Sequence, residues 1–270
     1  MSYYKSYYML KNLSIEWLKL KNYRTFWWLI GLFVLCLIGS NYITYQLKVV
    51  TSMQSKGGLD LLLGSPFSFP DVWQAVSYVS SYVLFLPGFL MVILITNEYN
   101  FKTHRQNIID GMSRTEFALT KIFMAVILSI LSTIVVVLIT IVTGLTAGSS
   151  FSLTGSVYIL YFLLQALTYT LGGLLLGTLL KKSGLSIAIY LIYIGFIKNL
   201  ISFLLDRYAG GIGSYMPVKS SDELIPMPFF KQVTKSLITP PDGTWLLIMT
   251  IFFIVAFYWI TVKRFKTQDL

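Results

Sequence analysis

The sequence predicts an all-α polytopic membrane protein with six transmembrane helices and both termini in the cytoplasm. Of its 270 residues, 56% are hydrophobic and only 12% are charged, which is about half the charged fraction of an average soluble domain. Several stretches of about 20 residues are apolar, the length at which a helix crosses the hydrocarbon of a bilayer. The net charge of +10 gathers on one side of these stretches, as cytoplasmic loops require.

Six apolar stretches are predicted to span the membrane. The second contains Pro87 and Gly88, and the fifth contains one charge, Lys198. Residues 122–180 hold no charge and are too long for a single span, so we divide them at the glycine-rich and serine-rich residues 144–156. The predicted spans are about 25–47, 72–97, 121–144, 157–180, 185–205 and 243–262.

The distribution of basic residues predicts the orientation. With the N-terminus in the cytoplasm, most of the 21 Lys and Arg residues lie on the inner side. Six spans return the chain to the side on which it starts, so the C-terminus is expected there too. Residues 1–270 thus form a single transmembrane domain with a long extracytoplasmic segment, residues 206–242.

In a soluble protein the excess of basic residues would suggest that the protein binds nucleic acid. Here it indicates a membrane face, and we expect no nucleic-acid partner.

Residues 7–24 precede the first span and are predicted to form an amphipathic helix in the membrane interface. Apolar residues recur at i, i+3, i+7 and i+10, which places them on one helical face. The indole of Trp17 would lie at headgroup level and the lysines would contact anionic lipid. The alternative is a plain cytoplasmic extension of the first span. The apolar face consists of Leu10, Leu13, Trp17 and Leu20.

The connection between the second and third spans, residues 98–116, is predicted to contain a short surface helix. Gly111 can end this helix. Ser113 can cap the next helix, with Glu116 three residues later as the partner in a capping box. A short helix with an apolar edge and mixed charges suits docking to a soluble protein. The alternative is a solvated connector.

The sequence offers no catalytic, metal or cofactor site. One Cys and one His cannot form a disulfide or a Cys/His zinc cluster. The phosphate-binding pattern G-x-x-x-x-G-K-[ST] and the serine nucleophile elbow are absent from the sequence. The chain therefore resembles the body of a transporter whose energy is expected from a partner.

Lys198 is the only ionisable residue that lies clearly inside a predicted span, because the eleven acidic residues fall in loops, tails or span ends. Intramembrane charges commonly mark substrate pathways. The alternative is that Lys198 snorkels toward the outer interface, near Asp206.

Two motifs resemble the permease subunits of bacterial type-2 ABC exporters. The first is the pre-membrane stretch Leu13-Ser-Ile-Glu-Trp-Leu-Lys-Leu-Lys, and the second runs from Thr96-Asn-Glu-Tyr to Gly111-Met-Ser-Arg-Thr-Glu-Phe. In that family, a Glu near the end of the second span opens a Thr- and Arg-rich stretch. This stretch forms a coupling helix and closes with a Ser-Arg-like turn.

The resemblance implies a function. Two permease chains, identical or related, would form the substrate pathway in the bacterial cytoplasmic (inner) membrane. Two ABC ATPase subunits would bind Mg-ATP and push on the coupling helices, while the permease chain itself would hold no cofactor. The residues implied in ATPase coupling are Glu98, Lys102, Thr103, His104, Arg105, Ile108, Asp110, Met112, Ser113 and Arg114. In this interpretation Ile108 and Met112 fill a pocket of the ATPase and the charged side chains surround it.

Two other functions are compatible with the composition. One is a non-transporting membrane anchor or assembly protein. The other is an intramembrane enzyme, which would need a polar constellation within the spans. Only Ser, Thr, Asn, Tyr and Lys198 are available there, and they form no recognised catalytic set.

Overall fold

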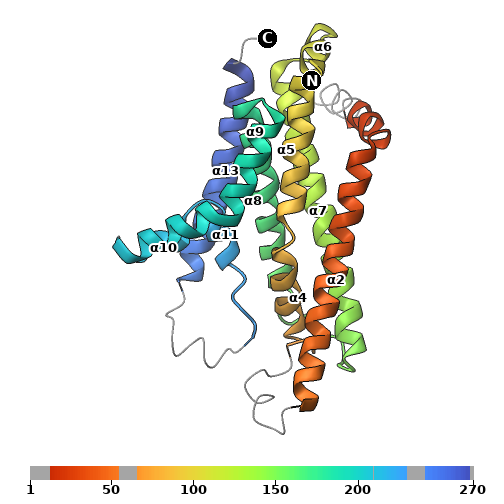
Figure 1. Cartoon of the computed structure of the whole chain (residues 1–270), viewed down its shortest axis with the longest axis vertical. Helices are drawn as coiled ribbons and strands as arrows, with labels where there is room; N and C mark the ends of the chain where they lie inside the picture. The colour runs from red at the N-terminus through yellow and green to blue at the C-terminus, as the bar shows by residue number, and fades with distance from the viewer. Residues whose placement is uncertain (1–12, 55–65, 209, 230–240, 268–270) are drawn as a thin grey trace.

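The computed structural model describes residues 13–54, 66–208, 210–229 and 241–267. Within these ranges all regular structure is helical, as predicted. The long helices lie side by side in an elongated bundle (Figure 1). Five helices are long and apolar enough to cross a membrane, or six if a bent pair counts as one span. Those five are Arg24–Val50, Arg114–Thr146, Val157–Leu180, Ser183–Tyr208 and Gly243–Thr267.

The two ends of the bundle differ in what they carry. Helix α6 (Thr103–Ile109) lies at one end, together with residues 13–21 and the last turns of α13 (Gly243–Thr267). We call this the α6 end. The opposite end carries the connection between α7 (Arg114–Thr146) and α8 (Val157–Leu180) (Figure 1).

Helix α2 (Arg24–Gln54) extends beyond the predicted limit at residue 47. Its polar residue Asn41 does not interrupt it, because the side-chain amide is satisfied inside the bundle. Asn41 Nδ2 donates to the carbonyl oxygen of Leu37 at 2.9 Å and to Ser80 Oγ at 3.0 Å. The second bond fastens α2 to the neighbouring helix, residues 72–81.

The second predicted span is a bent pair, α4 (Val72–Ser81) and α5 (Phe85–Asn100), with an angle of 42° between the two helices. Pro87 explains the break. It lacks the amide hydrogen that would bond to the carbonyl of Val83 in a continuous helix, and its ring disfavours the helical turn before it.

Helices α5 and α8 approach each other through glycines. A Cβ atom built on Gly173 would lie 2.3 Å from the carbonyl oxygen of Gly88, and one on Gly177 would lie 2.3 Å from Ile95 Cγ2. Small residues of this kind allow close backbone contact between helices in membranes. The glycines therefore set the distance between these two spans.

Helix α7 begins at Arg114, seven residues before the predicted limit of 121. The predicted capping box is confirmed. Ser113 Oγ accepts a hydrogen bond from the Glu116 amide at 3.2 Å, and Glu116 Oε2 accepts one from the Ser113 amide at 2.9 Å.

Helix α8 has the predicted bounds 157–180. Helix α13 continues past residue 262, to Thr267.

The fifth predicted span, 185–205, is a composite helix. It consists of α9 (Ser183–Ile192), the π-helical turn η1 (Tyr193–Ile197) and α10 (Lys198–Tyr208). A π-helical turn interrupts the ordinary hydrogen-bond register and is a common site of helix bending. In Figure 1, α9 follows the bundle, whereas α10 leans outward from it.

Part of the segment 206–242 folds back against the spans. It contains the short helices η2 (Ile212–Tyr215) and α11 (Lys219–Glu223). Helix α11 contacts α8 and α13. Its residue Asp222 reaches Tyr169, which lies near the middle of α8. A segment that the sequence placed outside the membrane thus brings charged residues against the bundle.

Candidate functional site

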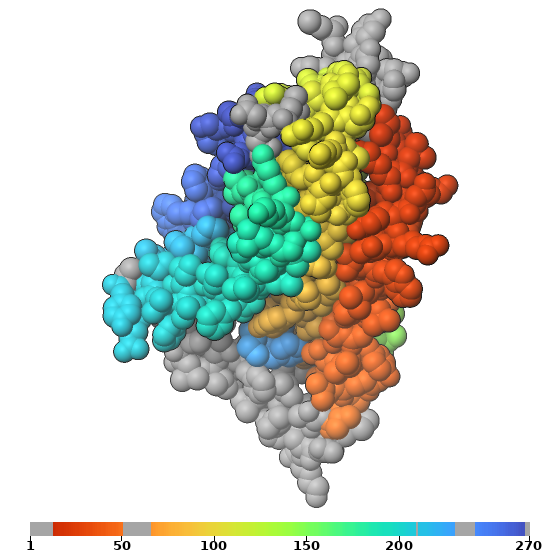
Figure 2. Space-filling view, turned by 45° about the horizontal axis from the view of Figure 1, so that its top comes forward, coloured from red at the N-terminus to blue at the C-terminus, as the bar shows by residue number. Residues whose placement is uncertain are grey.

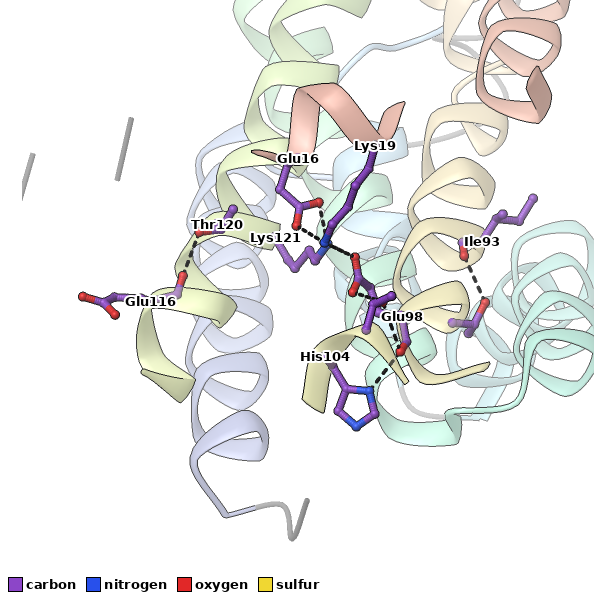
Figure 3. A network of polar contacts seen from close by, with 10 residues as sticks. Glu16, Lys19, Ile93, Glu98, His104, Glu116, Thr120 and Lys121 are labelled. Atoms are coloured by element: carbon purple, nitrogen blue, oxygen red, sulfur yellow. Dashed lines mark hydrogen bonds and ion pairs between the residues drawn. The ribbon is translucent and has the colours of Figure 1, made fainter. Parts of the chain in front are cut away.

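Four charged side chains meet at the α6 end, where residues 13–21, α5 and α7 come together (Figure 3). We call Glu16, Lys19, Glu98 and Lys121 the four-charge cluster. Lys121 Nζ lies 2.6 Å from Glu16 Oε2 and 2.6 Å from Glu98 Oε1. Lys19 Nζ lies 3.1 Å from Glu16 Oε1 and 3.2 Å from Glu98 Oε1. Each base therefore bridges both acids.

Three of the four side chains in the cluster are buried. Lys121 is 1% exposed, Glu16 4% and Glu98 6%. Buried charges require partners, because an unpaired ion in a low-dielectric interior is strongly destabilising. Lys121 also lies over the Phe117 ring, with Nζ 5.2 Å from the ring centroid. Two acids and two bases give the cluster no net charge.

Lys19 is the more accessible base of the cluster and lies in the N-terminal helical segment. Its partial burial lowers its pKa, but attraction and hydrogen bonds to Glu16 and Glu98 outweigh this effect. The pKa of Lys19 is therefore raised above its ordinary value. The residue carries its charge throughout the physiological pH range.

Glu98 also holds the start of α6. Thr103 Oγ1 donates to Glu98 Oε2. His104 Nδ1 lies 2.9 Å from the carbonyl oxygen of Glu98, and it must be the donor because a carbonyl only accepts. Lys102, at the turn between the helices, adopts a left-handed conformation with φ 56°. Helix α6 is therefore fastened to the last turn of α5.

Of the three residues predicted to form the apolar edge of the 98–116 connection, Ile108, Ile109 and Met112, only Ile109 is largely exposed. Ile108 and Met112 are only partly exposed, and Met112 packs against the core. Phe101 and Ile109 are instead 74% and 75% exposed. Ile108 and Ile109 differ because consecutive residues of a helix point in directions about 100° apart, and Ile109 lies on the exposed side of α6.

The charged residues implied in coupling lie in two different environments. Lys102, Arg105 and Asp110 are exposed around α6. Arg114 contacts the bundle instead, since its Nη1 donates to the carbonyl oxygen of Lys266 at 3.1 Å. That bond joins the start of α7 to the end of α13.

The N-terminal segment, residues 13–21, is helical, and the face that it turns to the bundle is not the apolar face predicted to lie in the membrane interface. Leu13 and Leu20 are partly buried, whereas Trp17 is 52% exposed. The Trp17 ring stacks edge-on against Trp27, with ring centroids 6.3 Å apart. Leu10 lies outside the described residues. The inward face is centred on Glu16, because pairing with Lys121 holds this carboxylate inside.

Sequence reasoning missed Glu16, Lys19 and Lys121 as site residues. The signal available for Lys121 was a single lysine beside an uncharged run of nearly sixty residues. For Glu16 and Lys19 it was the i, i+3 spacing of opposite charges on one helical face. Neither signal identifies the partner.

Lys198 takes part in a second polar centre, in the half of the bundle around α8, α10 and α11. It is 8% exposed, and its Nζ lies 2.5 Å from Asp222 Oδ2 and 2.7 Å from the Tyr169 hydroxyl. Its carboxylate partner is therefore Asp222 and not Asp206, the residue near which snorkelling was expected. Asp206 instead accepts a hydrogen bond from the Gly213 amide at 2.8 Å.

Asp222 receives two further hydrogen bonds in this centre. Gln165 Nε2 and the Tyr169 hydroxyl each donate to Asp222 Oδ1 at 2.9 Å. The expectation that acidic residues lie only in loops, tails and span ends overlooked this carboxylate. Its sequence position is in a loop, but the fold places it against the middle of α8.

Comparison with known proteins identifies a protein family that matches most of the chain. A family model described as ABC-2 family transporter protein matches residues 12–197. The matched region contains the whole four-charge cluster and α6. No curated protein is significantly similar to the chain.

Proposed function

The chain belongs to the ABC-2 transporter family, whose members are transmembrane permeases of ABC transporters that work with separate ATPase subunits. From that premise we propose that this permease forms the substrate pathway as a dimer, identical or mixed. We further propose that two ATPase subunits, which bind Mg-ATP, drive it through residues 98–116. In this proposal the α6 end faces the cytoplasm and the protein resides in the bacterial inner membrane.

The observation that carries the proposal is the link between α6 and the four-charge cluster. Thr103 and His104 bond to Glu98. Glu98 in turn pairs with Lys121 of α7 and with Lys19 of the N-terminal segment. A displacement of α6 is therefore transmitted to three membrane-adjacent elements through one carboxylate. Buried, bridged ion pairs suit this task because they resist separation.

The surface of the connection supports docking of a soluble subunit. Phe101 and Ile109 supply two large exposed apolar side chains, and Lys102 and Arg105 lie beside them. Apolar anchors surrounded by charged residues are typical of the energetic centres of protein interfaces. We propose that these two side chains, rather than Ile108 and Met112, enter the ATPase.

The test is the substitution Ile109→Asp in the full chain, co-expressed with its ATPase. An aspartate in a desolvated pocket opposes binding, and we expect association to weaken at least about tenfold. Co-purification of the ATPase and cargo-stimulated ATP hydrolysis are the measurements. The bundle itself is expected to remain folded, because Ile109 packs little against it.

Leu153→Asp provides the matched control. Leu153 is 66% exposed and lies in the connection between α7 and α8, at the opposite end of the bundle. This variant should retain both ATPase binding and stimulation. Undiminished coupling in the Ile109→Asp variant would rule out α6 as the docking element.

A further inference from the structure

A cavity of about 970 Å³ lies between α4, α8, α10 and α11. This volume is within the range of binding sites for drug-sized molecules. In Figure 2 the gold residues of α4 lie between the cyan residues of α10 and the orange residues of α2, with the light-blue residues that follow α11 just below them. Six aromatic rings contribute to the lining, those of Tyr78, Tyr82, Phe85, Tyr158, Tyr161 and Tyr169.

Two ion pairs lie in the same lining. One is Lys198 with Asp222, and the other is Lys219 with Glu223 at 2.8 Å. In the first pair the side chain of the base is 9% exposed and that of the acid 20%. In the second pair the values are 22% and 32%. In both pairs, the carboxylate is the more accessible member.

This asymmetry gives the cavity a preference for charge. The ammonium groups are turned toward protein partners, as Lys198 is toward Tyr169. The side chains of Asp222 and Glu223 keep a larger fraction of their surface exposed than those of their lysine partners. The faces of aromatic rings carry partial negative charge and attract cations. Both features favour a positively charged group, while the rings and neighbouring aliphatic side chains favour an apolar body.

We propose that this cavity binds an amphipathic cation, a molecule with an ammonium-like or phosphonium-like centre on an apolar body. The aromatic rings surround its apolar part, and Glu223 and Asp222 face its charge. As cargo recognition this rests on the proposed permease function. The binding itself requires no ATPase, so the two proposals fail separately.

The test uses tetraphenylphosphonium and tetraphenylborate, which have the same shape and opposite charge. Radiolabelled tetraphenylphosphonium and radiolabelled tetraphenylborate are bound in separate experiments to the purified full chain in detergent, each displaced by its own unlabelled form. We expect saturable binding of the cation, with binding of tetraphenylborate at least about tenfold weaker. Equal affinity for the anion, or absence of saturable cation binding, would overturn the proposal.

The variants Glu223→Gln and Tyr161→Leu locate the site. Each should weaken cation binding by about threefold to tenfold. Glu223 belongs to a partly exposed pair within one helix, so its replacement is expected to leave the fold intact. Asp71→Asn is the matched control, since Asp71 is a partly exposed carboxylate outside the lining. The assignment would be contradicted if both test variants bound the cation with wild-type affinity. It would also be contradicted if Asp71→Asn lowered the affinity as much as the test variants do.

Discussion

Glu98 of α5 contacts three other elements: the N-terminal segment, α6 and α7. Its carboxylate contacts Lys19, Lys121 and Thr103, and its carbonyl oxygen accepts from His104. The sequence identified Glu98 through a family motif, whereas only the fold reveals its partners. Asp222 is the comparable residue of the second centre, where it receives bonds from Lys198, Tyr169 and Gln165.

At the residue scale, Lys121→Met should destabilise the protein strongly. It leaves Glu16 and Glu98 buried with only the half-exposed Lys19 to neutralise them. Removing one partner of a buried ion pair costs about 3–5 kcal/mol. The measurement is the thermal unfolding midpoint of the purified chain in detergent.

Two variants distinguish lost pairing from a general effect of losing a lysine. Lys182→Met removes an exposed lysine and should leave the unfolding midpoint unchanged. Combining Lys121→Met with Glu16→Gln and Glu98→Gln removes the uncompensated charges and should recover most of the stability. A wild-type midpoint for Lys121→Met alone would show that the cluster contributes little.

At the element scale, the arrangement of α5 and α8 depends on glycines that the sequence presents without distinction. Gly172 and Gly173 are adjacent, yet only Gly173 touches the backbone of Gly88. A Cβ on Gly172 would lie 3.5 Å from the Phe257 ring, which is an ordinary contact. The rotation of α8 about its own axis decides which of the two glycines faces α5. Packing of the bundle sets that rotation.

Gly173→Ala should therefore force α5 and α8 apart, while Gly172→Ala should not. Overpacking of a close contact typically costs about 1–3 kcal/mol. We expect a lower thermal unfolding midpoint and less protein in the membrane fraction for Gly173→Ala, compared with Gly172→Ala. Equal behaviour of the two variants would mean that α5 and α8 do not approach as described.

At the scale of the whole molecule, α6 and the connection between α7 and α8 lie at opposite ends of the bundle (Figure 1). If the α6 end is cytoplasmic, a membrane-impermeant thiol reagent reaches the two ends from different sides. The background is Cys36→Ser, which removes the single cysteine of the chain. Into it are placed Gln106→Cys and, separately, Thr154→Cys, both at exposed positions.

We expect Thr154→Cys to be labelled in intact cells and Gln106→Cys only after the cells are opened. The physical reason is the positive-inside rule, since the basic connections lie at the α6 end. Maleimide labelling followed by a mass shift on a gel measures the outcome. Labelling of Gln106→Cys in intact cells would invert the proposed orientation.

The sequence by itself determined the helical class, the approximate positions of the long apolar helices and the capped start of α7. These follow from local patterns: apolar length, the spacing of charges, and a capping box of four consecutive residues. Tertiary structure decided the partners of Lys121 and Lys198, the outward turn of Ile109 and the return of α11 to the bundle. Each depends on residues 23 to 105 positions apart in the chain or on the rotation of a helix. The sequence does not indicate which of its distant opposite charges will form a pair. A charge needs a partner when it is buried away from water, and burial is a property of the packed bundle.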